Sequence, residues 1–210
     1  MTTVGEFNLS MVPVEFGGGT LNLEDLFDVG SNHKSDAIHN ADRTRRYALF
    51  RRWAPGPRVL WVLLNPSTAD ESRNDPTLRR CIAYTQAWGF GGLVVVNAFS
   101  IKATDPKDMK ASSNPGDDQE SDSYILKYAD EVIAEGGIIL CGMGAPASHR
   151  GRGRAVVDML KHHPLHYLIL TDGGYPGHPL YLSGNLTPQL WNNPHIPVKN
   201  QKGRRSNANE

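Results

Sequence analysis

Cysteine is scarce in this sequence, which has only Cys81 and Cys141 among its 210 residues. The two are far apart and each lies in an apolar segment, so neither a disulfide framework nor a cysteine-rich metal or iron–sulfur site is expected. The chain also lacks a charged-then-apolar leader and any apolar run near 18 residues. We therefore expect a cytoplasmic protein with no signal peptide, no membrane span and no membrane partner.

Net charge is also absent, because 22 Lys and Arg residues balance 22 Asp and Glu residues. This removes the simplest argument for nucleic-acid binding. Basic residues nevertheless crowd 43–58 and 149–154, and acidic residues crowd 117–122. A phosphate-binding face and a solvated surface both explain this segregation, and the second is commoner. The nucleophile elbow, the P-loop lysine motif and the full dinucleotide fingerprint are missing too.

One apolar run dominates what is present. Val59–Leu64 consists of β-branched, tryptophan and leucine residues and ends abruptly in the polar loop Asn65–Thr68. Such a run predicts a buried strand, and strands buried on both faces belong to parallel sheets. Ligands of such sheets bind at the carboxyl ends of the strands. Asn65 is therefore expected to lie where a ligand binds.

Strands and helices alternate along the rest of the chain. Further strands are predicted at 93–99, 138–141 and 167–170, with helices at 76–88, 121–135 and 151–163 between them. Residues 45–53 alternate in polarity and predict an edge strand. The pattern predicts a single three-layer α/β/α domain around a mostly parallel four-stranded sheet with an added edge strand. This domain is expected at 43–191, after an irregular arm at 1–42 and before a disordered tail at 192–210.

Three polar side chains are expected to meet at the carboxyl ends of the strands. Asn65 and Asn97 each follow a predicted strand, and His178 lies in a late glycine-rich loop. Asparagine offers a donor and an acceptor in one plane, which suits the edge of a nucleobase or a bound water. A histidine there can donate to a developing anion. The alternatives are that the asparagines organise loop backbone and that His178 is a surface residue.

Other residues at the same strand ends complete the predicted site. Asp70 is a candidate general base, whereas Asp75 is expected to cap the helix that begins at Pro76. The residues expected to bind substrate are Pro66, Ser67, Thr68, Asn97, Phe99, Gly142, Asp172 and Tyr181. His162 and His163 are adjacent on a predicted helix and are expected to point to different faces. No metal site and no cofactor are therefore predicted.

Several strings in the chain resemble those of a known family. LLNPSTAD, DPTLRRC, WGFGGLVVVNAFSIKATDP and DGGYPGHPLYL are similar to motifs of a bacterial and phage family of unknown function, over about 45–190. More distantly, the order of Asn65-Pro66-Ser67, Asn97 and His178-Pro179 resembles the uracil-DNA glycosylase superfamily. That resemblance implies the superfamily's fold, with Asn65 positioning the attacking water, Asn97 reading the base and His178 stabilising the departing base.

The expected function follows from this resemblance. It implies a glycosylase-like protein that recognises a modified or damaged nucleobase in DNA and hydrolyses its N-glycosidic bond. Four arginines are candidates to hold the DNA backbone while the base is flipped: Arg51, Arg52, Arg150 and Arg152. The alternatives are a non-catalytic nucleotide- or nucleic-acid-binding module, and an enzyme of free nucleosides or nucleotides. The non-catalytic module is favoured by one feature: Leu64-Asn65 stands where the most active superfamily branches carry Asp or Glu.

Overall fold

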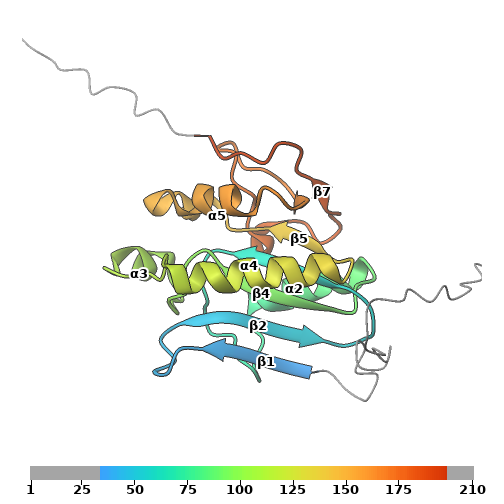
Figure 1. The fold of residues 1–210 in the computed structure, drawn as a ribbon, viewed down its shortest axis with the longest axis horizontal. Helices are drawn as coiled ribbons and strands as arrows, with labels where there is room; N and C mark the ends of the chain where they lie inside the picture. The colour runs from blue at the N-terminus through green and yellow to red at the C-terminus, as the bar shows by residue number, and fades with distance from the viewer. Residues whose placement is uncertain (1–33, 198–210) are drawn as a thin grey trace, which may run out of the picture. The chain divides into compact units, whose positions relative to one another are not determined.

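A seven-stranded sheet runs through residues 34–197, the part of the chain that the computed structural model describes (Figure 1). Its strands are β1 (Lys34–His39), β2 (Arg46–Arg52), β3 (Arg58–Leu63), β4 (Gly92–Asn97), β5 (Ile138–Cys141), β6 (Leu165–Tyr167) and β7 (Gln189–Leu190), in the order β1-β2-β4-β3-β5-β6-β7. The four central strands β4, β3, β5 and β6 are parallel, and β1, β2 and β7 pair antiparallel with their neighbours. The central strands therefore deliver their following loops to one side of the sheet, here called the carboxyl edge.

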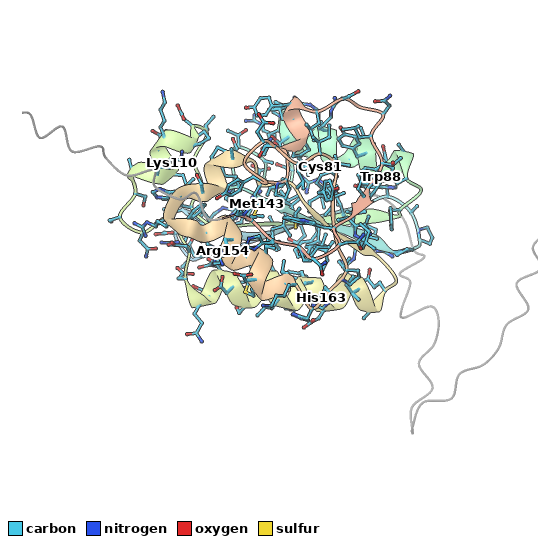
Figure 2. All side chains as sticks on the ribbon, turned by 90° about the horizontal axis from the view of Figure 1, so that it is seen from above. Cys81, Trp88, Lys110, Met143, Arg154 and His163 are labelled. Atoms are coloured by element: carbon cyan, nitrogen blue, oxygen red, sulfur yellow. The ribbon has the colours of Figure 1, made fainter. Side chains whose placement is uncertain are left out.

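Helices cover both faces of this sheet. The α-helices are α2 (Pro76–Ala87), α3 (Pro106–Ala111), α4 (Gln119–Ala134) and α5 (Arg152–Leu160), and two 3₁₀ helices span Ala145–Gly151 (η1) and Pro179–Tyr181 (η2). Side chains of β3 alternate between the faces. Trp61 packs in a cluster with α2, whereas Leu60 and Val62 pack in a cluster with α4 and α5. Figure 2 shows Cys81 of α2 and Trp88 at the end of that helix on one side, and Arg154 of α5 on the other.

Local sequence explains why α2 begins at the carboxyl edge. Asp75 has extended backbone, and its side chain accepts a hydrogen bond from the amide of Leu78 at 2.8 Å. Pro76 occupies the first helical position, where its missing amide costs nothing. The predicted cap and helix are both present. Because α2 follows the loop after β3, its N-terminus lies beside that loop.

The mixed α/β architecture with helices and parallel central strands is as predicted, but the sheet is wider. The predicted edge strand is β2, and it is interior because β1 pairs with it in the register Ser35↔Arg51. Residues 34–39 were expected within an irregular arm, since KSDAIH has no apolar alternation. An edge strand needs a neighbour on only one side, and its backbone hydrogen bonds suffice to hold a polar sequence there. The rest of the predicted arm, residues 1–33, lies outside the described residues.

Three other segments differ from the sequence predictions. The fourth parallel strand is at Leu165–Tyr167 rather than 167–170. Helix α3 forms between the predicted strand at 93–99 and the predicted helix at 121–135, where no element was predicted, because Asp105 caps it and Pro106 starts it. The expected tail begins too early at 192, because Ile196 is fully buried in the core; residues 198–210 are outside the described part. Within 34–197, no helix has the length and apolarity needed to cross a membrane.

Candidate functional site

Two cavities adjoin at the carboxyl edge. The larger, of about 500 Å³, is within the size range of small-molecule sites. The smaller, of about 30 Å³, is here called the recess. Both are lined by Asn65, Ser67, Asp75, Thr77 and His178, and the recess is also lined by Arg46 and Asn97. A polar recess therefore adjoins a larger pocket that is lined by more apolar side chains.

The predicted site residues divide into two groups. Six line these cavities: Asn65, Ser67, Thr68, Asn97, His178 and Tyr181. Five line neither of them: Pro66, Asp70, Phe99, Gly142 and Asp172. Phe99 is fully buried in the core, and Asp172 is exposed on its loop. Three segments distant in sequence thus contribute to one recess: the loop after β3, the end of β4 and the loop before η2.

Asn65 has a structural role and a free acceptor. Its Nδ2 donates to the carbonyl oxygens of Pro66 at 3.0 Å and Ala103 at 2.7 Å. These bonds hold the loop after β3 against the loop after β4, so the alternative interpretation of Asn65 as a loop-organising residue holds. Because the nitrogen serves both carbonyls, the amide orientation is fixed and Oδ1 is the atom left for a ligand.

Asn97 presents the opposite group. Its side chain is 4% exposed, and its Oδ1 accepts from Arg46 Nη2 at 3.4 Å. Its Nδ2 is buried and has no partner among the described residues. A buried amide donor left unpaired costs about 1–3 kcal/mol. Asn97 is therefore suited to donate to an acceptor atom of a ligand in the recess.

Arg46 is the site residue that the sequence did not single out. It is 4% exposed, donates from Nη1 to the carbonyl oxygen of Ala69 at 2.7 Å, and has an unpartnered Nε. Burial lowers its pKa to about 10, against the opposing effect of Asp75 and Asp70, so it remains a cation at neutral pH. No carboxylate of residues 34–197 forms an ion pair with it. A buried cation of this kind suits a site that handles negative charge.

His178 is a neutral imidazole at the junction of the two cavities. Its Nδ1 is buried and has no hydrogen-bond partner within residues 34–197, and burial lowers its pKa to about 4, with the Asp75 carboxylate acting in the opposite direction. The ring therefore carries one N–H at pH 7 and can donate to an anion without bringing a charge of its own. The Tyr181 ring lies 5.6 Å from the His178 ring and is 82% exposed at the rim.

The pKa of His178 predicts how stability depends on pH. The folded pKa of about 4 is below the ordinary histidine pKa of 6.5, so the unfolded chain binds this proton more tightly. The ionisation of His178 therefore leaves the free energy of unfolding unchanged above about pH 6.5. It lowers that free energy by about 3 kcal/mol as pH falls to about 4. Urea unfolding of the wild type and His178→Gln across this range should show that difference in free energy.

A matched variant separates this effect from that of other histidines. Burial also lowers the pKa of His39, His163 and His166, which steepens the pH dependence of both proteins equally. Only the difference between wild type and His178→Gln reports His178. Identical pH dependences in the two proteins would contradict the assignment of a neutral, buried His178.

Asp75, and not Asp70, is the acidic residue at the cavities. Asp70 Oδ1 accepts bonds from the amide and hydroxyl of Ser72 and from the amide of Arg73, and these bonds hold its pKa near 2. Asp70 thus organises a turn and lines neither cavity. Asp75 caps α2 with Oδ1, as expected, but it also lines both cavities. Its second oxygen makes Asp75 the carboxylate available to a ligand.

The four arginines expected on a DNA backbone do not line the two cavities. Each donates to groups of the protein: Arg51 to Asn74 and the Asp70 carbonyl, Arg52 to the Gly56 carbonyl, Arg150 to Asp117 and the Ser113 carbonyl, and Arg152 to Asp122 and the Ala98 carbonyl. Arg51 and Arg52 pair with Leu93 and Gly92 at the start of β4, opposite the carboxyl edge. These arginines stabilise loops and helix packing.

One family of proteins matches the segment of the chain that contains this site. Residues 46–180 match the family described as "Protein of unknown function (DUF1643)". No curated protein and no solved structure matches the chain. The matched segment begins at Arg46 and contains Asn65, Asp75, Asn97 and His178, so the whole recess lies within it.

Proposed function

This chain belongs to the DUF1643 family of proteins of unknown function, and we propose that its carboxyl-edge pocket binds a nucleobase and hydrolyses the N-glycosidic bond. One observation carries the proposal: Asn65 from the loop after β3, Asn97 from the last position of β4 and His178 from the loop before η2 line the same recess. The order of these residues resembles that in the uracil-DNA glycosylase superfamily. Their convergence supports the residue roles that the resemblance implies, and it supports a superfamily-like fold for the parallel central strands.

The hydrogen-bonding groups of the recess favour one kind of base edge. Asn97 offers a donor, because Arg46 engages its oxygen. Asn65 offers an acceptor, because two backbone carbonyls engage its nitrogen. A base with a carbonyl oxygen beside a ring N–H, such as uracil or hypoxanthine, presents the complementary pair. Cytosine and adenine place an amino group where the carbonyl is needed.

The charges in the site support a dissociative hydrolysis. As the glycosidic bond breaks, its electron pair moves to the base nitrogen, and the buried Arg46 and the N–H of His178 stabilise the resulting anion. Water adds to the sugar carbon and gives its proton to Asp75, whose second oxygen is free of the helix cap.

The larger cavity supports a substrate that extends beyond the base. Its volume of about 500 Å³ accommodates a nucleotide, and Tyr181 at its rim is an exposed ring on which a neighbouring base can stack. A base inside duplex DNA reaches such a site only when flipped out of the stack. The proposed substrate is thus a flipped or single-stranded nucleotide with an oxo base.

Release of free base is the direct test. Full-length protein is incubated with single- and double-stranded oligonucleotides carrying uracil, hypoxanthine or 5-hydroxymethyluracil, and free base is measured by chromatography. We expect release from at least one oxo base and none from matched strands carrying cytosine or adenine. No release from any of these strands, or from the corresponding nucleosides and nucleotides, would contradict hydrolysis.

A second function is supported by two observations. Asn65 stands where an acidic residue would make a stronger base, and the four expected DNA-binding arginines are engaged within the protein. These features favour a non-catalytic module that binds nucleotides or modified bases, or an enzyme of free nucleosides or nucleotides. Binding that is lost in Asn97→Ala, without base release by the wild type, would identify the module. Release from free nucleosides alone would identify the small-molecule enzyme.

A further inference from the structure

Three potential metal ligands meet where α5 ends beside α4. Asp130 is on α4, and His162 and His163 follow the last turn of α5 (Figure 2 labels His163). One ligand atom from each residue lies within 4.8 Å of the other two. His163 Nε2 is 3.0 Å from Asp130 Oδ1, and the two histidine rings are 4.0 Å apart.

The end of α5 explains how two adjacent histidines face the same point. The helix stops at Leu160, and the amide of His163 donates to the Leu160 carbonyl at 2.9 Å in the following turn. The expectation that they point to different faces assumed a helix continuing to 163, and it is wrong because the turn brings the rings together. Pro164 prevents the helix from resuming.

The geometry and the ligand types suit a transition-metal ion. Imidazole nitrogen and carboxylate oxygen are ordinary zinc ligands, and two such atoms at bonding distance from a tetrahedral ion lie about 3.4 Å apart. The 3.0 Å separation of His163 Nε2 and Asp130 Oδ1 is close to that value. The same nitrogen is buried and faces the Asp130 carboxylate, with which a protonated ring forms an ion pair and which a metal ion would bridge to the neutral ring. The ligand atom of exposed His162 lies within 4.8 Å of the other two.

We propose that Asp130, His162 and His163 form a binding site for a divalent transition-metal ion, with Zn²⁺ the best match. Three protein ligands leave at least one coordination position for water. The ion joins α4 to α5, two helices that pack on the same face of the sheet. None of the three residues lines the carboxyl-edge cavities, so this site is separate from the proposed nucleobase pocket.

Metal titration of the untagged full-length protein tests the proposal. Calorimetry with Zn²⁺ should give one site, and Co²⁺ as a spectroscopic substitute should give visible absorption bands that Zn²⁺ removes. His162→Ala and Asp130→Asn should each weaken binding about ten-fold or more. At a given Zn²⁺ concentration the ion should also raise the melting temperature of the wild type more than that of His162→Ala, because tighter binding stabilises the folded state more.

A matched histidine variant controls for nonspecific binding. His195 is exposed and lies outside the cluster, so His195→Ala should bind Zn²⁺ as tightly as the wild type. Because His162 is also exposed, its replacement should leave the fold intact, and circular dichroism checks this. Absence of binding to the wild type, or equal binding by wild type, His162→Ala and Asp130→Asn, would overturn the assignment.

Discussion

Replacing Asn97 with aspartate should weaken recognition of an oxo base by about 100-fold or more, while the protein stays folded. The change converts the unpartnered Nδ2 donor in the recess into an acceptor, which repels the carbonyl of the base. Oδ1 is retained for Arg46, and the new carboxylate gives that buried cation an ion-pair partner. The measurement is base release, or binding of an oligonucleotide carrying the preferred base.

Two controls are needed to interpret this experiment. Asn192→Asp makes the same chemical change at an exposed position outside the cavities, and it should leave recognition unaltered. A thermal unfolding curve of Asn97→Asp close to that of the wild type shows that the loss is not due to unfolding. Unaltered recognition by a folded Asn97→Asp protein would show that Asn97 does not read the base.

Replacing Asp75 with asparagine should reduce base release by about 10²–10⁴-fold with little change in stability. Asparagine is as good a helix cap as aspartate, so its oxygen still accepts the bond from Leu78 and α2 still forms. What disappears is the carboxylate that lines both cavities and receives the proton of the attacking water. Rates under single-turnover conditions, alongside binding constants, separate the loss of chemistry from the loss of binding.

Two further variants test whether Asp75 is the general base. Asp118→Asn makes the same change at the N-cap of α4, away from the site, and should leave the rate unaltered. Asp70→Asn removes the other aspartate of the loop after β3, which is engaged in a turn and has a pKa near 2. A large loss in Asp70→Asn together with none in Asp75→Asn would reverse the two roles.

Local patterns in the sequence determined much of the fold. Apolar runs identified β3, β4 and β5, helical spacing identified α2 and α4, and Asp75-Pro76 located the start of α2. Each of these signals depends on residues that are neighbours in the chain. The loops that follow parallel strands must lie at one edge of the sheet, so the meeting of Asn65 with Asn97 could be expected from topology.

Tertiary structure alone decided the chemistry around those residues. Arg46 belongs to an arginine-rich stretch, and only the pairing of β2 between β1 and β4 buries it in the recess while Arg52 lies at the opposite edge. Asp70 and Asp75 lie in the same loop, and only the tertiary structure shows that Asp75 lines the pocket and Asp70 does not.

The same distinction applies to the metal ligands and to the edge of the sheet. Asp130 is distant in sequence from His162 and His163, and they meet only because α5 ends at Leu160. Strand β1 has no apolar pattern, and pairing with β2 is what makes it a strand. Sequence periodicity thus determined the central strands and the helices α2 and α4, and with them the sheet edge at which the cavities lie. Contacts between distant segments, which depend on strand register and helix ends, decided which side chains are buried together and therefore what the site can do.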